Sequence, residues 1–118
     1  MKNYQTLNYY LEQFRQNVLK SHEVDYTVQG TIRRANRAVD NYRLAAKRIA
    51  EFYPESIASF AEFLYSDNLN LCNCCAVCIM EMFEQPNAFN NEALNIIRSL
   101  AKQEYAWELW LKYNGYSE

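Results

Sequence analysis

Glycine and proline are scarce in this sequence, which holds two of each in 118 residues. A β-sandwich or β-barrel needs many tight turns, and tight turns depend on these two residue types. The glycines, Gly30 and Gly115, are also too far apart to form a glycine-rich phosphate-binding loop. Half of the residues are hydrophobic and 22% are charged, which is typical of a folded globular chain. The sequence therefore predicts one helical domain over residues 1–118.

Apolar residues recur at steps of three and four along most of the chain, and no segment keeps the period of two that marks a strand. The clearest pattern runs from Ile32, on the expected inner face, to Tyr53, and Pro54 ends it. Ser56 is the expected N-cap of the next helix. The sequence thus predicts an all-α fold of five or six helices. The other expected helices cover residues 3–20, 56–65, 69–83 and 90–113, the last with a bend near Lys102 and a C-terminal cap at Asn114-Gly115.

Charge is distributed unevenly along the chain, although the formal net charge is only -2. Residues 1–50 carry nine Lys or Arg and four acids, whereas residues 51–97 carry seven acids and no Lys or Arg. Attraction between the two halves of the fold would explain this asymmetry, and so would an acidic surface for a basic partner. The second explanation predicts a partner-binding acidic face, with exposed aromatic side chains such as Tyr65 as anchors. Its candidate residues are Glu55, Glu62, Asp67, Glu81 and Glu84.

The helix predicted after Ile32 is basic on its outer side, which offers an alternative site. Arginines in such a stripe can contact phosphates, so a nucleic-acid-binding helix is the alternative function. A solvated helix surface is the favoured explanation of the stripe, and a protein contact is a further one. The acidic remainder of the chain would repel duplex DNA, so nucleic acid is the less favoured partner. The candidate residues of this basic face are Arg33, Arg34, Arg37 and Arg48.

Four cysteines lie within seven positions, and three of them follow the CxxC step of zinc and redox sites. A structural zinc site draws four ligands from two segments, and no second Cys or His segment exists here. Cysteine is also small and often buried, so we expect these residues to pack in the core, with no metal and no cofactor. The cysteines are Cys72, Cys74, Cys75 and Cys78.

No pairing of a nucleophile with a base can be named, and we therefore expect a protein that is not an enzyme. The single histidine, His22, is expected in a solvated loop, and the i, i+3 pair Glu81 and Glu84 on a solvated face. The first residues run into an amphipathic pattern rather than an apolar leader, and no apolar stretch approaches the ~20 residues of a membrane span. We expect a cytoplasmic protein without a membrane contact.

Residues 67–76 resemble the turn and second helix of a HEAT-type repeat. Asp67 matches the turn residue of the repeat, Leu71 its aliphatic position, and Cys75-Ala76 its two small residues. Cys72 stands where the repeat carries an arginine, so the Asp–Arg ladder that links stacked HEAT units lacks its arginine here.

The order of predicted helices is similar to that of a small bacterial family of HEAT-like proteins without an assigned function. Residues 110–115 come close to the Trp-x-x-x-Gly motif that ends those chains, with one extra residue. Proteins of this kind are often found beside secreted toxins and are proposed as their cytoplasmic immunity partners. The resemblance implies an α-α superhelix or HEAT-like bundle that binds a protein, such as a basic toxin domain, and catalyses nothing.

Overall fold

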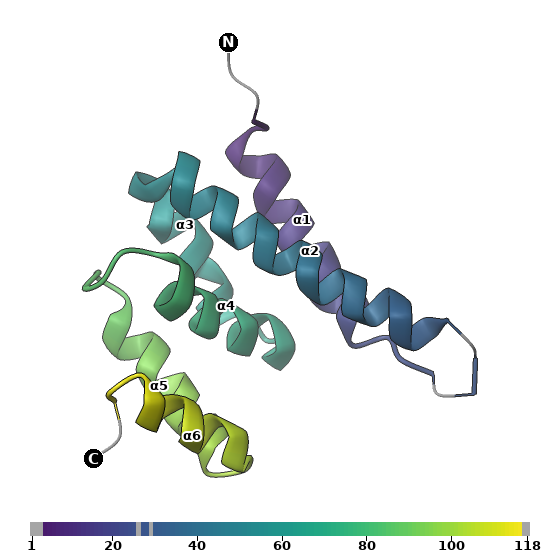
Figure 1. Cartoon of the computed structure of the whole chain (residues 1–118). Coiled ribbons are helices and arrows are strands. Elements are labelled where there is room, and N and C mark those ends of the chain that lie inside the picture. The colour runs from purple at the N-terminus through teal and green to yellow at the C-terminus, as the bar shows by residue number, and fades with distance from the viewer. Residues whose placement is uncertain (1–3, 26, 29, 117–118) are drawn as a thin grey trace.

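The computed structural model describes residues 4–25, 27–28 and 30–116, and its helices are drawn in Figure 1. These residues contain six α-helices, two short 3₁₀ helices and no strand, so the predicted all-α class is confirmed. The predicted bend near Lys102 separates the last two helices. The α-helices are α1 (Leu7–Ser21), α2 (Thr31–Phe52), α3 (Ile57–Ala61), α4 (Leu69–Met82), α5 (Asn90–Ala101) and α6 (Tyr105–Tyr113), and the 3₁₀ helices are η1 (Pro54–Ser56) and η2 (Glu62–Tyr65).

Helix α4 lies at the centre of the fold, between two pairs of helices (Figure 1). The first pair, α1 and α2, runs antiparallel, because the end of α2 meets the segment before α1. The Tyr53 hydroxyl donates a hydrogen bond to the Gln5 carbonyl oxygen at 2.8 Å, and the rings of Tyr4 and Phe52 stack at 4.2 Å. The second pair, α5 and α6, packs through α5 against the other side of α4. Helices α3 and η2 cover a third side of α4.

Aromatic rings join the helices in the core. Phe14 of α1 and Phe60 of α3 are fully buried, and their ring centroids are 4.7 Å apart. Phe60 also stacks on Phe83, which follows α4, at 5.3 Å. One aromatic chain therefore ties together segments that are far apart in the sequence.

Helix α2 approaches its neighbours closely because its buried face carries alanines, including Ala38 and Ala46. The expectation that Ile32 lies on the inner face is wrong, since its side chain is 48% exposed. Helix α2 has 22 residues and α4 has 14, so at 1.5 Å per residue α2 is about 12 Å longer. Its first turn projects beyond the core, towards the loop that joins it to α1 (Figure 1).

Of the two helix ends named from the sequence, the cap after α6 is confirmed and the cap at Ser56 is wrong, while the cap of α4 was not predicted. The Asn68 side chain caps α4 by accepting the Leu71 amide at 3.1 Å. Gly115 has a φ of +82° after α6, and the Tyr116 amide donates to the Leu111 carbonyl at 2.8 Å, as in a Schellman motif. Ser56 makes no capping bond, because α3 continues from η1 and the backbone of Ser56 is not extended as an N-cap requires.

None of the helices in the described part of the chain combines the length and the apolar character that crossing a bilayer requires.

Candidate functional site

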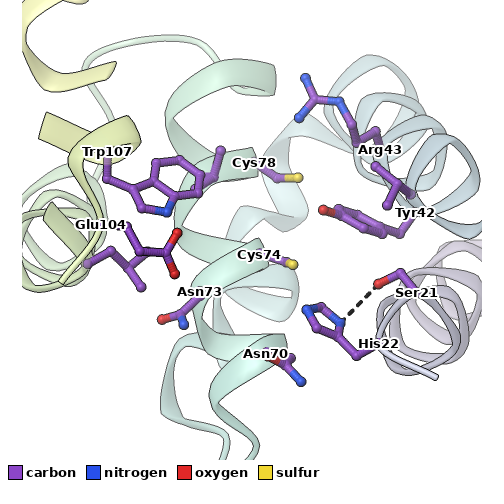
Figure 2. A pocket seen from close by; sticks show the side chains of 13 residues that line it. Ser21, His22, Tyr42, Arg43, Asn70, Asn73, Cys74, Cys78, Glu104 and Trp107 are labelled. Atoms are coloured by element: carbon purple, nitrogen blue, oxygen red, sulfur yellow. Dashed lines mark hydrogen bonds between the residues drawn. The ribbon is translucent and has the colours of Figure 1, made fainter. Parts of the chain in front are cut away.

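A hollow of about 330 Å³ lies between the α1–α2 pair and the α5–α6 pair, with α4 as its floor (Figure 2). We call it the central groove. Its lining combines apolar, amide, thiol and charged side chains from several helices. The lining residues are Ser21, His22, Val39, Tyr42, Arg43, Asn70, Asn73, Cys74, Val77, Cys78, Leu100, Glu104 and Trp107.

The floor of the central groove is a single face of α4. Asn70, Asn73, Cys74, Val77 and Cys78 are spaced at three and four residues, so their side chains share one side of the helix. Sequence reasoning assigned Cys78 to the buried face and left Asn70 and Asn73 without a role. The helical spacing of α4 places these polar residues on one face. That face becomes the floor of a hollow only because other helices pack on either side of it.

Tyr42 reaches from α2 towards the two cysteines of the floor (Figure 2). Its hydroxyl points towards the Cys74 thiol (Figure 2). Burial raises the pKa of the Tyr42 hydroxyl and also raises the pKa of the Cys74 thiol. Both groups are therefore neutral near pH 7, which makes them poor nucleophiles.

His22 is exposed at the end of α1, in the position expected of a solvated histidine. Its Nδ1 lies 3.0 Å from the Val18 carbonyl oxygen and 3.0 Å from the Ser21 hydroxyl. The Ser21 hydroxyl donates its proton to the same Val18 carbonyl at 2.6 Å. These contacts cap the C-terminus of α1, and they leave the hydroxyl bonded to backbone rather than activated by the imidazole.

Two charged side chains of opposite sign, Arg43 and Glu104, line the central groove, and one of them is compensated by a residue outside the lining. The Arg43 guanidinium lies 3.1 Å from the Glu81 carboxylate, across the interface of α2 and α4. Glu104, which precedes α6, is exposed and has no ion pair within the described residues. Glu81 does not line the groove itself, but it compensates Arg43, so Glu104 carries the uncompensated charge among the lining carboxylate and guanidinium groups.

The five candidate residues of the acidic face lie in different surroundings. All five are exposed, but Glu81 is compensated by Arg43, whereas the other four have no ion pair within the described residues. Glu62 and Asp67 precede α4, and Glu81 and Glu84 lie at its end, while Glu55 belongs to η1. Helix rise alone places Glu81 about 18 Å from the first residue of α4. The acids are thus distributed along α4 and do not gather at a single point.

One part of this surface combines acids with exposed apolar side chains. We call it the acidic turn and define it as Glu62, Tyr65, Asp67 and Leu69. Tyr65 is 66% exposed and Leu69 is 72% exposed. Sequence reasoning named Tyr65 as a possible anchor but missed Leu69, which stands at the first position of α4.

Hydrogen bonds hold the acidic turn in place. The Ser66 hydroxyl accepts the Asn68 amide at 3.1 Å, and Asn68 in turn caps α4. The Tyr65 hydroxyl donates to the carboxylate of Glu92 on α5. A surface that is already ordered loses less conformational entropy when a partner binds.

The basic face is divided by the structure. Arg34 and Arg37 join Lys20 of α1 around a second hollow of about 310 Å³, which Glu23 also lines. Arg33 is exposed in the same part of α2. Arg48 lies near the other end of α2, where it pairs with Glu51 at 3.2 Å and its guanidinium carbon is 5.9 Å from the centre of the Phe52 ring.

The cysteines mostly serve as packing residues. Cys75 and Cys78 are buried, and the Cys75 thiol donates to the Phe60 carbonyl at 3.4 Å. Cys72, at the position of the HEAT arginine, donates to the Leu64 carbonyl at 3.2 Å and so joins α4 to η2. Burial is the main reason that the pKa of Cys78 rises from 9.0 to about 12. Within the described residues, no three Cys, His, Asp or Glu side chains gather closely enough to hold a metal ion.

Comparisons of this chain with protein-family models, with curated proteins and with solved structures find no match. The likeness to HEAT-type proteins therefore remains a prediction from residues 67–76 and 110–115.

Proposed function

We propose that this chain is a non-enzymatic protein-binding module, and that it docks a basic partner through the acidic turn. The observation that carries the proposal is the charge pattern of this surface. Residues 51–97 hold no Lys or Arg, and Glu62 and Asp67 have no ion pair within the described residues. They stand beside the exposed side chains of Tyr65 and Leu69.

This combination suits a protein interface. Acidic side chains attract a basic partner over a distance and raise the rate of association. Tyr65 supplies a large contact area at a low cost in side-chain entropy, and Leu69 adds apolar area next to it. The neutral thiol and hydroxyl groups of the central groove support a binding role over a catalytic one.

The finer form of the proposal is a cytoplasmic immunity protein that neutralises a toxin. It is supported by the resemblance to HEAT-like proteins and by the acids of the turn. A toxin that cleaves nucleic acid needs a basic surface for its own substrate. An acidic protein bound at that surface would exclude the substrate.

The test uses purified proteins encoded next to the gene for this chain, with affinities measured by isothermal titration calorimetry. The double variant Glu62→Lys and Asp67→Lys should bind at least tenfold more weakly than the unaltered chain. The matched control, Asp40→Lys with Glu108→Lys, changes the net charge equally at exposed sites outside the turn and should bind as the unaltered chain does. Equal weakening in both variants would refute the acidic turn as the docking surface. Failure of every neighbouring protein to bind would refute the immunity form.

A nucleic-acid-binding module is the second candidate, because Lys20, Arg34 and Arg37 surround the second hollow. This candidate predicts binding to a short duplex that weakens steeply with salt and on substitution of Arg34 and Arg37 by glutamine. Duplex binding that does not depend on salt, or no duplex binding, would contradict this candidate and leave protein binding as the proposed function.

A further inference from the structure

We infer that the central groove receives an arginine side chain of the partner protein, and that Glu104 and Trp107 recognise its guanidinium group. This inference rests on the proposed function, since it names a second contact made by the same basic partner. It concerns a different surface from the acidic turn, so the two can be tested separately.

The size of the central groove suits one long side chain. Its volume of about 330 Å³ is near the lower end of the range of about 300–1,000 Å³ for ligand pockets. The hollow opens between two helix pairs and closes at α4 (Figure 2). An extended side chain can enter such a space while the backbone of its protein stays outside.

The uncompensated charge at the central groove favours a cation. Arg43 is already engaged by Glu81 at 3.1 Å, so its positive charge is compensated within the fold. Glu104 has no such partner within the described residues, and its carboxylate lies at the groove (Figure 2). A carboxylate offers two acceptor oxygens, which match the paired N–H groups of a guanidinium.

The second recognition group is an aromatic ring beside that carboxylate. Trp107 follows Glu104 by one helical turn, and its amide donates to the Glu104 carbonyl at 3.1 Å. Both side chains reach the groove from the same side (Figure 2). Trp is the aromatic residue that binds cations best through the face of its ring.

Acceptors for the remaining guanidinium protons come from the floor. The side-chain amides of Asn70 and Asn73 line the groove, and among the described residues neither is hydrogen bonded. A guanidinium has five N–H donors, more than one carboxylate can accept. A lysine ammonium would leave part of this acceptor set unused, and it lacks the plane that stacks on indole.

The experiment titrates the full chain, labelled with ¹⁵N, with Nα-acetyl-arginine amide and follows the amide and indole N–H signals by NMR. Nα-acetyl-citrulline amide at matched ionic strength is the control ligand, because it keeps the shape of arginine without its charge. We expect saturable millimolar binding of the arginine derivative only, with shifts at the Trp107 indole and at the Asn70 and Asn73 side chains. Trp110→Phe identifies which indole signal belongs to Trp107.

Two variants with the same change of charge localise the effect. Glu104→Gln should weaken binding of the arginine derivative about tenfold, since it removes a charge-assisted hydrogen bond. Glu108 lies on α6, four residues after Glu104 but outside the lining of the groove, so Glu108→Gln should leave binding unchanged. Far-ultraviolet circular dichroism verifies that both variants fold.

Several results would overturn the inference. These are equal binding of the citrulline derivative, binding of Nα-acetyl-lysine amide as tight as that of arginine, shifts that do not saturate at the groove, and equal affinities of the two glutamine variants. If a partner binds the Glu104→Gln variant normally but binds the double variant Glu62→Lys and Asp67→Lys more weakly, the inference fails and the proposed function stands. If the arginine derivative binds in the groove while charge reversal of Glu62 and Asp67 leaves the affinity for the partner unchanged, the acidic turn is refuted as the docking surface instead.

Discussion

The guanidinium of Arg43 on α2 lies 3.1 Å from the carboxylate of Glu81 on α4, which joins two residues that are 38 positions apart in the sequence. This ion pair removes one acid from the predicted acidic face. It also compensates the one arginine that lines the central groove, so Glu104 determines the sign of the charge there.

The Arg43–Glu81 pair should stabilise the fold only modestly. Its side chains are 40% and 29% exposed, and pairs with this access to water contribute about 0.2–1 kcal/mol. We expect a coupling energy in this range from a double-mutant cycle of Arg43→Gln and Glu81→Gln, measured by urea denaturation, and a smaller value at high salt. The same cycle on Arg33 and Asp40, which form no ion pair within the described residues, should give no coupling. A coupling that is equal in both cycles would contradict the assignment.

Removal of the α4 cap should cost more stability than removal of the serine before α3. Asn68→Ala deletes the acceptor of the Leu71 amide and should lower the free energy of unfolding by about 1 kcal/mol. Ser56→Ala deletes a side chain that makes no capping bond, so its effect should stay within about 0.5 kcal/mol. Thermal or urea denaturation of the two variants provides the comparison, and the reverse order would show that α3 depends on Ser56.

The aromatic chain through the core should be sensitive to truncation. Phe14 is fully buried, and its ring lies near those of Phe60 and Tyr42, with centroids at 4.7 and 5.6 Å. Phe14→Ala should therefore destabilise the protein by about 3–5 kcal/mol in equilibrium unfolding. Tyr113→Ala removes an aromatic side chain that is 80% exposed and should change stability by about 0.5 kcal/mol or less. Similar losses in both variants would contradict the described core.

The free energy of unfolding should fall in alkaline solution, because a buried thiol loses its proton more readily in the unfolded chain than in the fold. The pKa of Cys78 is 9.0 as an ordinary thiol and about 12 in the fold, so the unfolded chain loses this proton first. The stabilisation is fully present below pH 9 and is lost as the pH rises towards 12. Between about pH 8 and about pH 10, Cys78→Ala should therefore lose less free energy of unfolding than the unaltered chain. Equal losses would mean that the Cys78 thiol is not shielded from water.

Local patterns were sufficient to predict the elements of the fold. Steps of three and four indicated the helices, and Pro54 and the segment near Lys102 indicated where helices end. These signals are readable because a helix repeats every 3.6 residues and its ends need particular side chains. The burial of Cys75 and Cys78 followed from the same period.

The candidate site could not be predicted from such local patterns. Glu104 and Trp107 stand at the start of α6 and give no motif, and Asn70 and Asn73 look like ordinary surface residues of a helix. Ile32 has the right spacing for the core but lies in the turn of α2 that extends beyond it. The sequence by itself determined which segments are helices and which of their sides are apolar, because both depend on neighbours within two turns. Only the tertiary structure decided how the helix pairs are arranged around α4. This arrangement forms the central groove and gives Glu81 its partner, because contacts between residues that are tens of positions apart depend on how the helices pack.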